Sequence, residues 1–114
     1  MLIYVGRDGV QRPEHLNEEL AWLKSLCIDL ECLRAGVPPS SAKLDAAPFI
    51  DDYEFAQRGV TVLAGEVTGH PPFKTTRTIT SDLCLFAPDL GWARTFSRYY
   101  RLGSPSHKIA RWFT

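Results

Sequence analysis

The segment from Pro13 to Ala35 constrains the fold more than any other part of the chain. Pro13 suits the first turn of a helix, and the acids that follow it complement the positive end of the helix dipole. Gly36 can adopt the left-handed conformation that ends a helix, and Pro38 and Pro39 prevent its continuation. The sequence therefore predicts one long helix over residues 13–35.

Apolar side chains recur along this segment at steps of four and three, which places them on one face of a helix. This leucine stripe consists of Leu16, Leu20, Leu23, Cys27 and Leu30, widened by Leu26 and Leu33. Because isolated helices are marginal in water, we expect the stripe to be buried against a sheet. A smaller apolar strip on the other flank would either lie under a loop or form a homodimer contact, through Ala21, Ile28 and Cys32.

Most of the remaining chain has the composition of β-structure. Ser40 and Ser41 can cap one short helix that ends at Ala47, before Pro48. Segments rich in β-branched and aromatic residues, separated by Gly and Pro, then predict strands. These strands are expected at residues 60–68, 76–86 and 92–102, with further short strands at 2–5 and within 49–57.

Length and composition set the fold class. A chain of 114 residues with 45% hydrophobic and 23% charged residues is typical of one globular domain. We expect a single α+β domain over residues 1–114, in which the amphipathic helix packs on a three- to four-stranded antiparallel sheet. The sheet is a meander over residues 49–102, followed by a tail at 104–114.

Cysteine count and hydropathy bear on the compartment. Three cysteines, an odd number, disfavour a disulfide framework and favour buried thiols in a reducing cytoplasm. The sequence contains no apolar run near the ~20 residues that span a bilayer, so no membrane association is expected.

The net charge is zero, but the charges are unevenly distributed along the chain. Residues 1–66 hold 11 acids and 6 bases, whereas residues 67–114 hold 2 acids and 7 bases. Such asymmetry is a hint of an anionic partner, although the two halves could equally neutralise each other within the fold.

The segment Gly91–Leu102 carries the most unusual pattern of side chains. As a strand it would place alternating rings and guanidinium groups on one face, which we call the aromatic–arginine face: Trp92, Arg94, Phe96, Arg98 and Tyr100. The spacing of four also fits a helix, but the Thr and Tyr content favours a strand. With Lys108 and Arg111 of the tail, this face could bind a protein or a nucleic acid. Alternatively it packs on the helix, with its arginines paired to Asp45, Asp51, Asp52 or Glu54.

Residues of the types used in catalysis and metal binding are present but poorly patterned. Glu66, His70 and Ser81 would suit a small hydrolase if their strands paired, yet the Gly-x-Ser-x-Gly motif is missing. The histidines and cysteines lack metal-binding spacing, and Gly65–Gly69 is not a phosphate loop. We therefore expect no catalytic residue, no metal and no cofactor.

Several short blocks within residues 62–103 resemble a family of small uncharacterised proteins from alphaproteobacteria and their mobile elements. The blocks are Gly65–Pro71, Thr80–Ser81, Gly91–Thr95, Ser97–Arg98 and Tyr100–Gly103. The resemblance implies no activity. Its mobile-element setting suggests a non-catalytic regulator or inhibitor of a protein or nucleoprotein complex, similar to an anti-CRISPR protein. Direct nucleic-acid binding is the first alternative, and hydrolysis through Ser81, His70 and Glu66 is the second.

Overall fold

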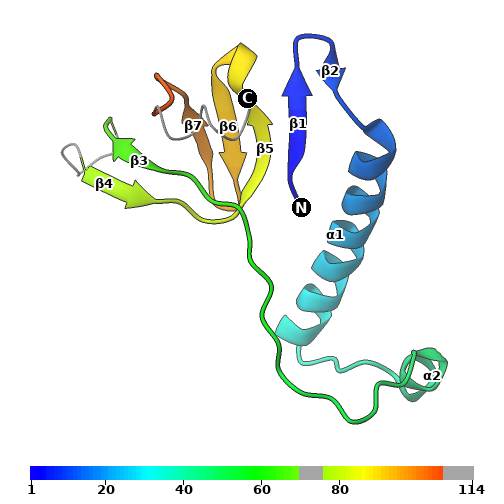
Figure 1. The fold of residues 1–114 in the computed structure, drawn as a ribbon. Helices are drawn as coiled ribbons and strands as arrows, with labels where there is room; N and C mark the ends of the chain where they lie inside the picture. Colours follow the sequence, from blue (N-terminus) through cyan, green and yellow to red (C-terminus); the bar gives the residue numbers. More distant parts are fainter. Residues whose placement is uncertain (70–75, 107–114) are drawn as a thin grey trace. The chain divides into compact units, whose positions relative to one another are not determined.

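The computed structural model describes residues 1–69 and 76–106, and it divides the chain into two compact units (Figure 1). The first comprises residues 1–13 and 59–114 and contains the strands, so we call it the sheet unit. The second, residues 14–58, is the helical unit. The expectation of a single domain over residues 1–114 stays a prediction, whereas the α+β class is confirmed.

The helical unit is dominated by α1 (Pro13–Arg34), within one residue of the predicted helix. Its C-terminus is closed by the hydrogen-bond pattern of a Schellman motif. The Gly36 N–H donates to the Leu33 carbonyl at 2.9 Å, and the Val37 N–H donates to the Cys32 carbonyl at 2.8 Å. Gly36 has a φ of +79°, a conformation that glycine adopts without steric cost.

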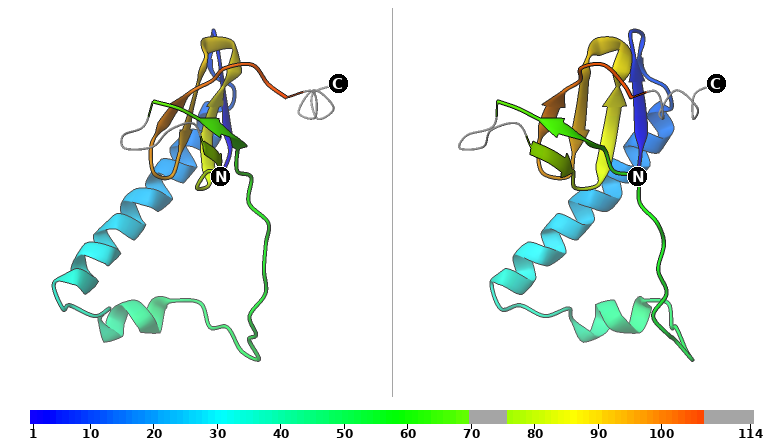
Figure 2. Two further views of the ribbon diagram at one scale, coloured as in Figure 1. Left: turned by 90° about the vertical axis from the view of Figure 1, so that its left-hand side faces the viewer. Right: turned by 60° about the vertical axis from the view of Figure 1, so that its left-hand side comes forward.

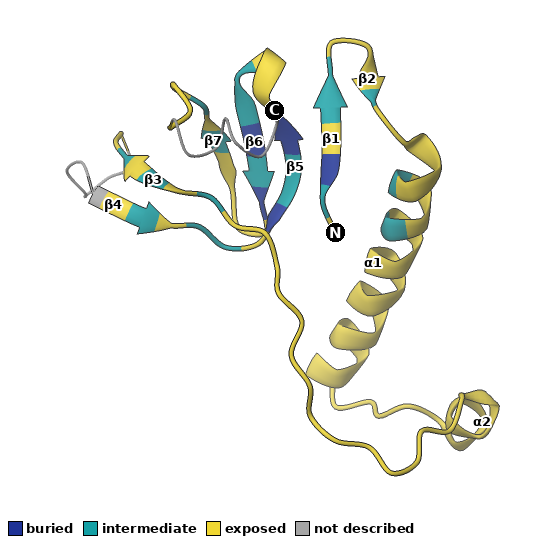
Figure 3. Cartoon of the chain, viewed as in Figure 1, coloured by how far each residue is buried: buried dark blue, intermediate teal, exposed yellow. Residues whose placement is uncertain are grey.

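Within the helical unit no other element covers the leucine stripe of α1, so its burial against the sheet stays a prediction. No residue of α1 is buried, and Leu20, Leu23, Cys27 and Leu30 are all exposed (Figure 3). From Glu14 onward α1 belongs to the helical unit, which contains no strand. Cys32, which we also expected to be buried, is exposed, and Cys84 is partly exposed.

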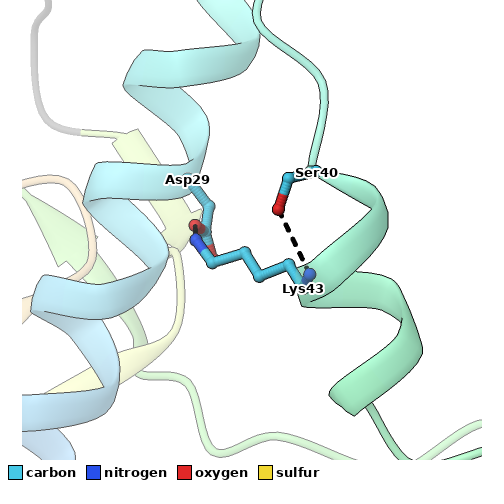
Figure 4. Close-up of polar contacts among 3 residues, drawn as sticks. All are labelled: Asp29, Ser40 and Lys43. Atoms are coloured by element: carbon cyan, nitrogen blue, oxygen red, sulfur yellow. Dashed lines mark hydrogen bonds and ion pairs between the residues drawn. The ribbon is translucent and has the colours of Figure 1, made fainter.

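The second helix, α2 (Ser41–Ala46), is the short helix predicted from its capping residues. Ser40 is the N-cap, and its Oγ accepts a hydrogen bond from the Lys43 N–H at 3.1 Å (Figure 4). The Lys43 ammonium lies 3.5 Å from the Asp29 carboxylate of α1. Both side chains are exposed, so this ion pair contributes little stability.

The sheet unit contains a five-stranded mixed sheet with the strand order β2-β1-β5-β6-β7 (Figures 1 and 2). Its strands are β1 (Ile3–Gly6), β2 (Gly9–Val10), β5 (Leu83–Ala87), β6 (Trp92–Thr95) and β7 (Tyr99–Arg101). The prediction of a purely antiparallel sheet was wrong for one pair of strands, because β1 runs parallel to β5. The expected short N-terminal strand thus lies between β2 and the central strand β5, and the other pairings are antiparallel.

A second, two-stranded antiparallel sheet consists of β3 (Ala64–Val67) and β4 (Thr76–Ile79). The strand predicted over residues 76–86 is therefore divided into β4 and β5. Thr80 lies at the division, where its hydroxyl accepts from the Leu63 N–H at 3.0 Å and donates to the Ser81 carbonyl at 2.8 Å. Such local side-chain bonds compete with a strand ladder. The strand expected within residues 49–57 is not formed.

A tight turn precedes Trp92. The 3₁₀ helix η1 (Pro88–Leu90) connects β5 to β6, and Gly91 follows it with a φ of +79°. Proline at the first position favours the turn, and glycine provides the left-handed residue that redirects the chain. This connection makes β5 and β6 an antiparallel pair, with Ala87 opposite Trp92.

The core of the sheet unit lies on one face of β5 and β6. Leu83, Phe86 and Ala93 are buried there, and they are covered by the partly buried side chains of Leu2, Leu63 and Leu102. Figure 3 shows that the buried residues gather in β1, β5 and β6. On the opposite face, Trp92 and Arg94 of β6 are partly exposed, and Tyr99 and Arg101 of β7 are exposed.

Candidate functional site

The single strand predicted over residues 92–102 is interrupted in its middle. It ends as β6 at Thr95 and resumes as β7 at Tyr99. Thr95 is 1% exposed and closes the turn, since its hydroxyl donates to the Arg98 carbonyl at 3.1 Å and accepts from the Arg98 N–H at 3.3 Å. The backbone N–H of Thr95 donates to the same carbonyl at 2.9 Å. The aromatic–arginine face does not exist as one continuous strand face.

The hairpin instead brings a different set of side chains together. Arg94 lies opposite Tyr99, and Trp92 lies opposite Arg101. Because directly opposed residues of an antiparallel pair project to the same side, all four share one face of the sheet. We call this set the edge cluster: Trp92, Arg94, Tyr99 and Arg101. Tyr100 lies opposite Ala93 on the other face and is partly buried, which corrects its predicted place.

Ring and guanidinium contacts order the edge cluster. The rings of Trp92 and Tyr99 meet edge to face, with centroids 5.8 Å apart and planes at 69°. The Arg94 Cζ lies 5.0 Å from the centroid of the Tyr99 ring, within cation–π distance. Tyr99 is nevertheless 65% exposed. The cluster is thus held in place by its own contacts while a large aromatic surface stays available to a ligand.

Arg101 and the outer edge of β7, which pairs with no further strand within residues 1–69 and 76–106, complete the surface. A Cβ atom added at Gly69 would lie 4.0 Å from a guanidinium nitrogen of Arg101, so the backbone passes close to this side chain. β7 is the last strand in the sheet order. Two backbone hydrogen bonds join the ends of the hairpin: the Leu102 N–H donates to the Gly91 carbonyl at 2.9 Å, and the Thr95 N–H donates to the Arg98 carbonyl at 2.9 Å. By antiparallel alternation, the backbone groups of Tyr99 and Arg101 point away from β6.

The other residues predicted for the aromatic–arginine face lie elsewhere. Phe96 is in the turn and is 75% exposed, and Arg98 is exposed at the start of the return strand. Lys108 and Arg111 lie outside the described residues. The structure therefore keeps Trp92 and Arg94 together and replaces the other members by Tyr99 and Arg101.

Tyr99 and Arg101 were missed because the turn at Phe96 and Ser97 carries no sequence signal. Two-residue hairpin loops usually contain Gly, Asn or Asp at positive φ. In the part of the chain that the structure describes, Asp52 is the one residue other than glycine with positive φ. A buried threonine hydroxyl closes this turn instead, and sequence alone does not show that Thr95 is buried.

Ser81 belongs to a group of hydroxyls next to this turn. Its Oγ lies 2.7 Å from the Ser97 Oγ and accepts a hydrogen bond from the Ser97 N–H at 3.2 Å. Glu66, the proposed acid of a hydrolase, lies on β3 opposite Arg77. His70 is outside the described residues. The bonds of Ser81 connect the start of β5 to the hairpin turn, which is a structural role.

Within residues 1–69 and 76–106, no group of three or more His, Cys, Asp or Glu side chains is placed to hold a metal ion. None of the helices in the same residues has the length and apolar character needed to cross a bilayer.

Comparisons with known proteins give one match. A family model described as a family of unknown function, DUF6634, matches residues 17–110. No curated protein and no solved structure matches the chain. The expectation of a family without an assigned activity is confirmed, and the match extends well beyond the 62–103 region on which the resemblance rested. It includes the whole edge cluster.

Proposed function

The chain belongs to the DUF6634 family of unknown function, and we propose that it is a non-catalytic binding protein whose edge cluster engages another protein. One observation carries the proposal: a Trp–Tyr–Arg cluster is ordered by internal ring contacts yet exposes most of Tyr99. Tryptophan, tyrosine and arginine dominate the binding energy of protein interfaces. A surface that is ordered before binding loses less entropy when the partner docks.

The chemistry of the surface suggests the kind of partner. Arg94 and Arg101 contribute two positive charges, and no acid belongs to the cluster. The outward backbone groups of β7 could accept an extended segment as an added strand. We propose that the partner presents an extended acidic segment, whose carboxylates pair with the guanidinium groups beside Tyr99.

The proposal includes a biological role and a compartment. A small protein that acts through one contact surface fits a regulator or inhibitor of a protein or nucleoprotein complex. The thiols of Cys27, Cys32 and Cys84 are free, which supports the reducing cytoplasm as its location.

The proposal is tested by using the protein as bait to capture its binding partners from a lysate of the source cell, with two matched variants. Tyr99→Ala removes the exposed ring of the edge cluster, whereas Tyr53→Ala removes a somewhat more exposed ring from the helical unit. We expect one captured protein to be lost with Tyr99→Ala and retained with Tyr53→Ala, as measured by quantitative mass spectrometry. Equal capture by both variants would rule out the edge cluster as the contact surface.

Direct binding of nucleic acid is distinguished from binding of a protein by how steeply the affinity depends on salt concentration. Each neutralised phosphate releases counterions, so such binding weakens steeply as salt rises. Because the edge cluster contributes only Arg94 and Arg101, we expect no binding tighter than about 1 µM to short DNA or RNA at physiological salt. Fluorescence anisotropy at two salt concentrations measures this. A salt-sensitive nanomolar complex that is lost in an Arg94→Ala/Arg101→Ala double variant would make nucleic acid the primary partner.

A further inference from the structure

The leucine stripe of α1 is an apolar face without a partner within the helical unit. Leu20, Leu23, Leu26, Leu30 and Leu33 are between 41% and 57% exposed. A helix of 22 residues with such a face gains most of its stability from packing that face against another element. The sequence of the stripe identifies what that element is.

The stripe follows the heptad repeat of a coiled coil. Its steps of four and three place Leu16, Leu23 and Leu30 at d positions, and Leu20 and Cys27 at a positions. In parallel coiled coils, leucine at d combined with β-branched residues at a favours two strands, and this stripe matches that pattern at its d positions. We propose that α1 pairs with the α1 of a second copy of this chain as a parallel, in-register, two-stranded coiled coil.

Charge complementarity favours the parallel arrangement. In this register Glu19 is at position g and Lys24 is at position e of the following heptad. A parallel pair places the g residue of one helix beside that e residue of the other, so the Glu19–Lys24 attraction forms twice by symmetry. An antiparallel pair with the same apolar layers would instead bring Lys24 next to Lys24 of the second copy.

The other flank of α1 faces away from this seam, and Arg34 occupies the a position at the C-terminal end of the helix. Ala21 and Ile28 are at b and Cys32 is at f, so the strip that we first considered for a homodimer is turned away from the contact. Asp29 is at c, where its ion pair with Lys43 does not occupy the seam. The proposed dimer therefore uses the leucine stripe and not the smaller strip.

The oligomeric state of charge variants tests the proposal. We expect the full chain to sediment as a dimer, and Glu19→Lys or Lys24→Glu alone to weaken dimerisation at least tenfold. The double variant Glu19→Lys/Lys24→Glu should recover it, because the pair is rebuilt with reversed sign. Glu18→Lys, at the outward f position, is the matched control and should leave the dimer unchanged.

Sedimentation equilibrium over a range of concentrations gives these dissociation constants. A chain that stays monomeric at all concentrations would overturn the proposal and indicate that the stripe is covered within its own chain. A dimer that is equally stable in both single charge variants would overturn it as well.

The natural cysteines distinguish the two helix directions. In the parallel register Cys27 meets Cys27 of the second copy, whereas in the antiparallel register it meets Leu23. We expect oxidation with copper phenanthroline to give a covalent dimer that is lost with Cys27→Ser and kept with Cys32→Ser. A dimer that forms no Cys27 crosslink would contradict the parallel arrangement.

Discussion

At the residue scale, Thr95 decides which side chains form the edge cluster. Its buried hydroxyl bonds both backbone groups of Arg98 and closes the turn between β6 and β7. Had the strand continued through residue 102, Tyr100 would have shared a face with Trp92, and Tyr99 would not. The alternation of side chains was predictable from the sequence, but the interruption that resets it depends on the local hydrogen bonds of one buried hydroxyl.

Thr95→Val tests this role, because valine has nearly the same shape and a higher strand propensity. Loss of the hydroxyl removes two hydrogen bonds to the backbone of Arg98, so we expect a loss of about 1–3 kcal/mol in the free energy of unfolding. Urea denaturation measures it, with the exposed Thr68→Val as the control. An unchanged midpoint for Thr95→Val would show that the hydroxyl does not hold the turn.

At the element scale, local signals predicted α1 and α2 well and the strands less well. The caps of the helices are made by neighbouring residues, such as Ser40 with Lys43 and Gly36 with Leu33. Strand boundaries depend on partners far along the chain. The division between β4 and β5 arises where Thr80 bonds Leu63, and the parallel pairing of β1 with β5 joins residues about 80 positions apart.

Gly36→Ala is predicted to destabilise the end of α1. Alanine at a φ of +79° costs about 1–2 kcal/mol, and no atom lies within 4 Å of the added Cβ, so the backbone conformation alone is responsible. Thermal unfolding followed by circular dichroism at 222 nm measures the change. Gly59→Ala is the matched control, since that glycine also has open space but no positive φ. Equal melting of the two variants would argue against the Schellman cap.

At the scale of the whole molecule, the uneven charge distribution follows the two units. The helical unit carries nine acids and four bases, whereas the sheet unit carries four acids and nine bases. The charge asymmetry seen in the sequence is therefore a property of separately clustered parts of the chain. The edge cluster belongs to the basic unit, which is consistent with an acidic protein partner. The α+β class followed from composition and periodicity, whereas the membership of the cluster required the strand register.

The most direct test of the central proposal is hydrogen exchange of the β7 amides with and without the captured partner. The N–H groups of Tyr99 and Arg101 point away from β6, so an added strand would protect them. We predict that both amides exchange at least tenfold more slowly in the complex, while the Tyr53 amide is unchanged. Unaltered exchange in β7, with protection confined to the helical unit, would contradict the assignment of the edge cluster as the binding surface.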